Sequence, residues 1–154
     1  MDLILWRHAE AQDARDGQGD LERALTTKGE RQAERMAQWL TRRLGASTRI
    51  LVSPAQRCQQ TVAALGRAFE TVEAIGLDAS VAGLLAAAGW PDADEPVLVV
   101  GHQPTLGLVA ARLLADVDQP WSMKKGAVWW LRRRERDGAG AQVVLQAVLG
   151  PDCV

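Results

Sequence analysis

The sequence is poor in the residues that build metal centres and disulfide frameworks. Its 154 residues include two cysteines, two histidines, one phenylalanine and no tyrosine. Cys58 and Cys153 form neither a metal-ligand spacing nor a disulfide framework. Two histidines with no acidic motif beside them also make a poor metal site. We therefore expect a protein that needs no metal and no other cofactor.

The sequence also lacks a strong net charge and a long apolar run. Its net charge is −1 at pH 7, so no overall basic field indicates binding to nucleic acid or to an anionic membrane. No apolar run approaches the roughly 20 residues of a membrane span. The N-terminal apolar stretch is too short for a signal peptide and has no basic region before it. We expect a cytoplasmic monomer that binds neither nucleic acid nor membranes.

What the sequence does contain is an alternation of strand-length apolar runs and helical patterns. Strands are expected at 2–6, 49–52, 71–75, 96–101, 126–134 and 142–149. Helices are expected at 27–44, 54–69, 80–88 and 105–114. This alternation indicates a mostly parallel sheet with helices on both faces, and the last two strands read as an antiparallel hairpin. The expected fold class is an α/β three-layer sandwich that forms one domain over residues 1–154.

Local signals predict where the first two helices begin. Thr26 or Thr27 is expected to cap the first helix, and Thr27 with Glu30 has the spacing of a capping box. Ser53 followed by Pro54 fits an N-cap and a proline at the first helical position of the second helix.

Both histidines follow directly after a predicted buried strand. Arg7 and His8 come after the first strand, and His102 comes after the most apolar strand of the chain. Arg57 follows the second strand, in the first turn of a helix. Ligand crevices in open α/β sheets lie outside the carboxyl ends of the strands, so these four side chains are expected to share one edge. Arginine binds phosphoryl oxygens through two hydrogen bonds, and neutral imidazole is a nucleophile, so the pattern predicts a phosphate site.

Four motifs, in order along the chain, resemble the histidine phosphatase superfamily. They are Arg7-His8-Ala9, Leu25-Thr26-Thr27-Lys28-Gly29, Ser53-Pro54-Ala55-Gln56-Arg57-Cys58-Gln59-Gln60-Thr61 and Gly101-His102-Gln103-Pro104. Ala9 stands where the larger branch usually has glycine. The short length and the L-x-R-x-L-T-T segment that contains Arg23 most resemble the short branch, the SixA-type phosphohistidine phosphatases.

The resemblance implies a role for each matching residue. His8 is expected to be the nucleophile that becomes phosphorylated, and Arg7 and Arg57 to clamp the phosphoryl oxygens. His102 is expected to complete the pocket and stabilise the charge of the transition state. Arg23, in the long polar loop at 11–24, matches a further phosphate-contacting arginine of the short branch. Water then hydrolyses the phosphoenzyme. The positive charge of these residues stabilises the phosphoryl oxygens, so no metal ion is needed.

The resemblance does not identify a group that protonates the leaving atom. Larger relatives use a carboxylate for an alkoxide leaving group, and the short branch characteristically lacks it. Of Glu70, Glu73 and Asp78, none lies in a matching motif, and Asp78 is the best candidate. Imidazole can leave already protonated, so this gap favours a phosphorylated protein carrying phosphohistidine over a small phosphate ester. The alternatives are a small-molecule phosphomonoesterase or mutase of the same superfamily and a non-catalytic phosphate-binding module.

Cys58 directly follows Arg57 and raises the question of a cysteine-based phosphatase. Such an enzyme needs an arginine six residues after the cysteine, and that position is Ala64. We therefore expect Cys58 to be a packed helix residue.

Overall fold

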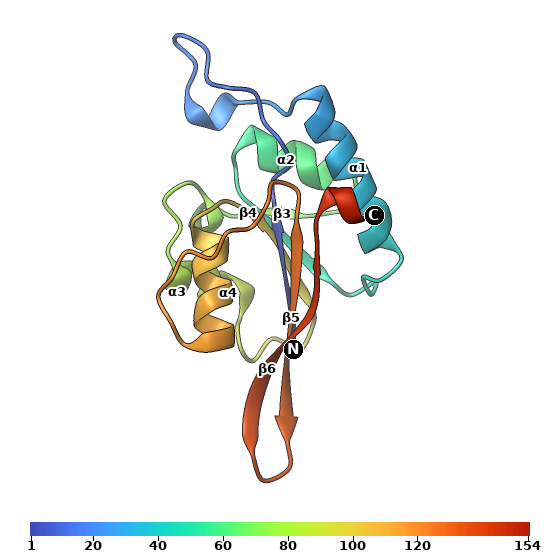
Figure 1. Ribbon diagram of the computed structural model, residues 1–154, viewed down its shortest axis with the longest axis vertical. Helices are drawn as coiled ribbons and strands as arrows, with labels where there is room; N and C mark the ends of the chain where they lie inside the picture. Colours follow the sequence, from blue (N-terminus) through green and yellow to red (C-terminus); the bar gives the residue numbers. More distant parts are fainter.

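The computed structural model describes residues 1–154 as a six-stranded sheet with helices on both faces (Figure 1). The strands are β1 Asp2–Arg7, β2 Arg49–Val52, β3 Glu70–Thr71, β4 Val97–Gly101, β5 Val128–Arg136 and β6 Gly140–Leu149. The helices are α1 Thr27–Thr41, α2 Gln56–Ala63, α3 Val81–Ala88 and α4 Thr105–Ala115, with short 3-10 helices η1 Asp20–Glu22, η2 Glu73–Ile75 and η3 Pro151–Cys153. No helix combines the length and the apolar character needed to cross a membrane.

The sheet has the order β3-β2-β4-β1-β5-β6. Its first four strands are parallel, and β5 and β6 are added as an antiparallel hairpin. This confirms the predicted α/β sandwich with a mostly parallel sheet and a C-terminal hairpin. Figure 1 shows that this hairpin projects beyond the end of the other strands.

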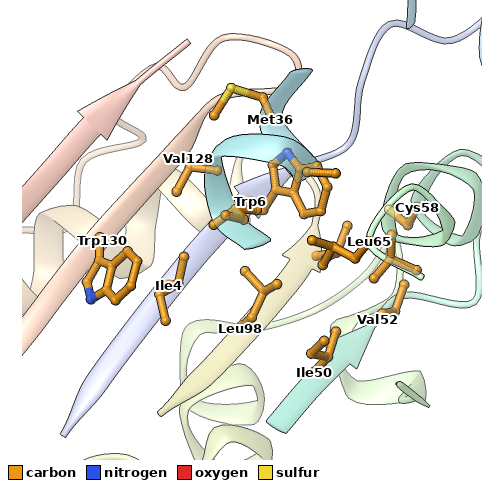
Figure 2. Close-up of a cluster of buried hydrophobic side chains, with 14 of the residues drawn as sticks. Ile4, Trp6, Met36, Ile50, Val52, Cys58, Leu65, Leu98, Val128 and Trp130 are labelled. Carbon is orange, nitrogen blue, oxygen red and sulfur yellow. The ribbon is translucent and has the colours of Figure 1, made fainter. Parts of the chain in front are cut away.

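Alternation along β1 divides its side chains between two cores. Ile4 and Trp6 pack on one face against helices α1 and α2, and Figure 2 shows Trp6 beside Met36 of α1. Leu3 and Leu5 pack on the other face against α3 and α4. Successive side chains of a strand point to opposite faces, so a strand covered on both sides is apolar throughout. This burial fixes the position of the carboxyl end of β1, where Arg7 is the last residue of the strand and His8 follows it.

The first helix begins one residue earlier than its predicted capping box. Thr26 is the N-cap, and its hydroxyl accepts a hydrogen bond from the Gly29 amide at 2.9 Å, so the box formed by Thr27 and Glu30 is wrong. A Cβ at Gly29 would collide with the Glu10 carbonyl oxygen, so glycine lets this helix start pack against the chain after β1. The helix ends at Thr41 rather than at residue 44.

The second helix is shorter than predicted at both ends. It runs from Gln56 to Ala63 with Ala55 at the N-cap, and the predicted cap by Ser53 is wrong. Its far end is set by Gly66, whose φ of +62° is a left-handed conformation that glycine adopts readily and that stops a helix. Between this helix and α3, only Glu70–Thr71 forms a strand, and η2 occupies most of the strand predicted at 71–75.

Candidate active site

The two histidines lie side by side because β1 and β4 are paired neighbours. Arg7 is paired with Gly101 in the parallel ladder, and the His8 amide donates to the Gly101 carbonyl at 3.1 Å. The rings of His8 and His102 lie 5.4 Å apart between centroids, and both residues are buried. The sheet therefore brings two predicted site residues, 94 positions apart in the sequence, to one edge.

His8 is held as a neutral imidazole with one nitrogen free. Its Nδ1 lies 2.8 Å from the carbonyl oxygen of Ala9, and because a carbonyl only accepts, Nδ1 carries the proton. Burial lowers the pKa of His8 to about 3, with the charges of Arg57, His102 and Arg7 acting in the same direction. The Nε2 atom therefore keeps its lone pair near neutral pH, which is the state that a nucleophile needs.

Thr61 of α2 fixes the backbone around this tautomer. The Ala9 amide donates to the Thr61 hydroxyl at 3.0 Å, and that hydroxyl donates to the Arg57 carbonyl at 2.7 Å. The buried Thr61 side chain thus links two parts of the site. One is residue Ala9, whose carbonyl holds His8, and the other is the helix turn that carries Arg57.

His102 is oriented by two partners on either side of its ring. Arg57 Nη2 lies 3.3 Å from His102 Nδ1, and because a guanidinium only donates, Nδ1 accepts. Nε2 therefore carries the proton and donates to the Ser53 hydroxyl at 2.7 Å. Burial, followed by the charge of Arg57, lowers the pKa of His102 to about 4. Ser53 was expected to cap a helix, so the sequence did not reveal its contact with His102, although its place at the end of β2 is a possible signal.

The two arginines beside His8 have donors that no protein group uses. Arg57 is 4% exposed, and Arg7 is anchored by a 2.6 Å hydrogen bond from Nη1 to the Met123 carbonyl. The Nε atoms of both residues are buried and have no hydrogen-bond partner. Burial and the nearby charge of Arg57 lower the pKa of Arg7. Unpaired buried donors are costly, and two like charges close together are unfavourable, so both features suit a bound oxyanion.

Asp20 links the loop at 11–24 to the site, and sequence reasoning missed it. Arg57 donates to the Asp20 carbonyl oxygen at 2.7 Å and to its carboxylate at 3.1 Å. The same carboxylate binds Arg23 at 2.9 Å, and the Arg23 hydrogen bond is the largest influence lowering the pKa of Asp20. Arg23 is thus brought to Arg57 through Asp20 and makes no hydrogen bond to His8 or His102. The segment Asp20-Leu21-Glu22-Arg23 carries no local pattern that predicts this bridge.

No other carboxylate is joined to these residues. Asp78, the candidate proton donor, is exposed and makes no hydrogen bond or ion pair with any of them. Glu10 accepts from the Thr26 hydroxyl at 3.0 Å and lies 3.8 Å from Lys28, and Glu70 pairs with Arg49. No three His, Cys, Asp or Glu side chains form a group that could hold a metal ion.

Cys58 is a packed core residue, as predicted. It is fully buried on α2, and burial raises the pKa of its thiol to about 12. A thiol with this pKa is protonated at neutral pH and is a poor nucleophile. The chemistry of the site therefore depends on the histidines and arginines.

Comparison with known proteins identifies the class of protein to which this fold belongs. A family model described as histidine phosphatase superfamily (branch 1) matches residues 3–81, just over half of the chain. The chain belongs to this superfamily. The matched segment contains His8, Arg23 and Arg57, and His102 lies beyond it.

Within the superfamily the chain is similar to proteins of the SixA type. It is 29% identical to the phosphohistidine phosphatase SixA of Escherichia coli over 128 residues, which cover 78% of each chain. A solved structure of a protein of the SixA type from Nakamurella multipartitia is 30% identical, covers 97% of this chain and 95% of its own, and has a TM-score of 0.78. The structure of the protein histidine phosphatase SixA complexed with tungstate is 27% identical, covers 99% and 98%, and has a TM-score of 0.77.

Proposed function

We propose that this phosphatase removes the phosphoryl group from phosphohistidine on a protein, through a phosphohistidine intermediate at His8. Arg7 and Arg57 bind the phosphoryl oxygens, and His102 stabilises the charge that develops on them. Arg23 acts with Arg57 through Asp20 and adds positive charge at the mouth of the pocket. Similarity to the phosphohistidine phosphatase SixA of E. coli supports this proposal, and so does similarity to a SixA protein whose structure holds tungstate, which is an oxyanion.

The proposal depends mainly on one observation, which is that the site contains no carboxylate able to donate a proton. Asp20 is the one carboxylate in contact with the site, and two arginines hold it ionised. An ionised carboxylate cannot donate a proton to a leaving alkoxide. A phosphohistidine whose imidazole already carries its second proton needs no such donor, because it leaves as neutral imidazole.

The reaction then has two balanced displacements at phosphorus. In the first, His8 Nε2 forms a bond to phosphorus while the bond from phosphorus to the substrate imidazole breaks. In the second, the oxygen of a water molecule bonds to phosphorus and the bond to His8 breaks, which leaves His8 neutral. Inorganic phosphate is released with both protons of the water. Phosphoryl transfer of this kind depends mainly on positioning and charge stabilisation, which the buried arginines supply.

A comparison of leaving groups tests the proposal. The purified protein is assayed with a chemically phosphorylated histidine peptide, 4-nitrophenyl phosphate and glycerol phosphate. We expect kcat/KM to be highest for the peptide and about a hundredfold or more lower for glycerol phosphate, because general acid catalysis contributes about 10²–10⁴ where it operates. Equal or faster hydrolysis of glycerol phosphate would indicate a small-molecule phosphomonoesterase instead.

Two further measurements examine the covalent step and the absence of a metal. Phosphoenzyme trapped by rapid quenching should be labile in acid and stable in alkali, as a phosphoramidate is. Phosphate that survives acid would identify a serine or threonine ester. EDTA should leave the rate unchanged, and a loss of activity that a divalent ion restores would contradict the metal-independent mechanism.

A further inference from the structure

A hollow lies beside the candidate site formed by His8, His102, Arg7 and Arg57. It is a cleft of about 360 Å³ whose wall includes Leu21, Pro54, Glu73, Leu77, Asp78 and Ser80. Leu21 and Leu77 are 47% and 38% exposed, so the cleft presents two large apolar side chains to whatever enters it. Burying such side chains stabilises a complex, so the exposed leucines suit the cleft to binding.

The cleft lies next to the site, because two of its lining residues directly follow residues that contact the site. Leu21 follows Asp20, whose carboxylate binds Arg57, and Pro54 follows Ser53, whose hydroxyl binds His102. Another lining residue, Ala79, is bound to the start of α4, which follows His102, because the Thr105 hydroxyl donates to the Ala79 carbonyl at 2.9 Å. When the phosphoryl group of a substrate lies beside His8, the rest of the substrate therefore lies next to this cleft.

The charge of the cleft is opposite to that of the pocket. Glu73 and Asp78 line it, neither forms an ion pair, and no lysine or arginine takes part in its wall. The site beside it contains the guanidinium groups of Arg7 and Arg57. A second anionic group on the substrate would meet two unpaired carboxylates, whereas a basic group would be attracted to them.

We propose that this cleft binds the polypeptide flanking the phosphohistidine of a partner protein, and that it selects apolar and basic residues against acidic ones. The inference rests on the proposed function and adds the sequence preference of the substrate. The two leucines contact an apolar side chain of the bound segment, and the two carboxylates contact a neighbouring lysine or arginine.

The test uses two chemically phosphorylated histidine peptides of equal length. One carries leucine and lysine next to the phosphohistidine, and the other carries leucine and glutamate at the same positions. We expect kcat/KM to be about tenfold higher for the lysine peptide, because two exposed charge contacts are each worth up to about a factor of five. Equal values for the two peptides would overturn the inference.

Charge reversal in the cleft sharpens the test. The double variant Glu73→Lys/Asp78→Lys should lose the preference for the lysine peptide or reverse it, with the effect weakened by salt. The matched control is Asp94→Lys/Glu95→Lys, which makes the same change in net charge at two exposed residues just before β4, at the opposite end of this strand from His102. The control should keep the preference of the wild-type protein, and a preference that both double variants lose equally would overturn the inference.

The outcomes also separate this inference from the proposed function. If neither peptide is hydrolysed while 4-nitrophenyl phosphate is turned over in a reaction that needs His8, the proposed function and the inference both fail. If both peptides are hydrolysed at the same rate, only the inference fails. Retention of the lysine preference in the Glu73→Lys/Asp78→Lys variant would likewise overturn it alone.

Discussion

The candidate site has two halves that are built in different ways. One half consists of His8, His102 and Arg7, which stand at the carboxyl ends of buried paired strands and are held by backbone carbonyls and the Ser53 hydroxyl. The other half consists of Asp20 and Arg23, which lie on the loop at 11–24 and are partly exposed. Arg57 belongs to both, since it donates to His102 and to Asp20.

This difference separates the proposed reacting groups from the groups proposed to adjust charge. The strand half holds His8, the proposed nucleophile, as a neutral imidazole in one tautomer. The loop half supplies counter-charges through side chains that water reaches. We therefore expect substitutions in the strand half to remove the chemistry and substitutions in the loop half to weaken it.

The largest effect is expected from His8→Ala. Removing the proposed nucleophile should lower kcat on phosphohistidine peptide and on 4-nitrophenyl phosphate by about 10⁴-fold or more, because the proposed covalent intermediate forms on His8. Rapid-quench assays with radiolabelled substrate should detect no phosphoenzyme. Activity close to that of the wild-type protein would show that His8 is not the nucleophile.

Arg57→Lys tests the residue that joins the two halves. Lysine keeps the charge but cannot hold His102 and Asp20 at once through a planar fork, so kcat should fall by about 10²-fold. The control is Arg35→Lys on the exposed side of α1, which should have no effect on the rate. Circular dichroism checks that the buried position tolerates lysine, and an unchanged rate in a folded variant would contradict the assignment.

The strand half should also make the protein sensitive to acid. The pKa values of His8 and His102 fall from 6.5 in the unfolded chain to about 3 and about 4 in the folded protein. The unfolded chain therefore binds more protons below pH 6.5, and the free energy of unfolding should fall as the pH falls from 6.5 to about 4. Each histidine contributes about 1.4 kcal/mol per pH unit, a factor of ten in the unfolding equilibrium.

Urea unfolding at several pH values measures this slope. His102→Gln should remove about half of the histidine contribution, since only His8 is then left to take up a proton on unfolding. An unchanged slope in that variant would mean that His102 is not held neutral in the folded protein.

The smallest effect is expected from Asp20→Asn in the loop half. The amide still accepts a hydrogen bond but no longer holds Arg57 and Arg23 by charge, so kcat/KM should fall by about fivefold. Hydrogen exchange of residues 11–24 should become faster, because the loop loses its charged contact with α2 and keeps only the bond from Arg57 to the Asp20 carbonyl. Asp13→Asn, an exposed carboxylate of the same loop without a partner, is the control. A loss as large as that of Arg57→Lys would remove the distinction between the two halves.

Sequence patterns were most informative where burial dictates them. The continuous apolar runs of β1 and β4 predicted two buried parallel strands. Each run is followed by a histidine, so the sequence alone predicted that both histidines lie at one edge of the sheet. The nearby prediction that Ser53 caps a helix was wrong, because its hydroxyl instead accepts from His102 and from the Ala55 amide. A hydroxyl at the start of a helix can satisfy a local or a distant donor, and the local pattern is the same in both cases.

The sequence by itself determined the alternating α/β architecture, the two strand-end histidines and the motifs that place the chain in its superfamily. Only the tertiary structure decided which groups touch them: the Ala9 carbonyl on His8, Ser53 and Arg57 on His102, and Asp20 between Arg57 and Arg23. The physical reason is range. Periodicity and burial are set by near neighbours in the chain, whereas the protonation state of a buried histidine depends on partners brought together from other strands and loops.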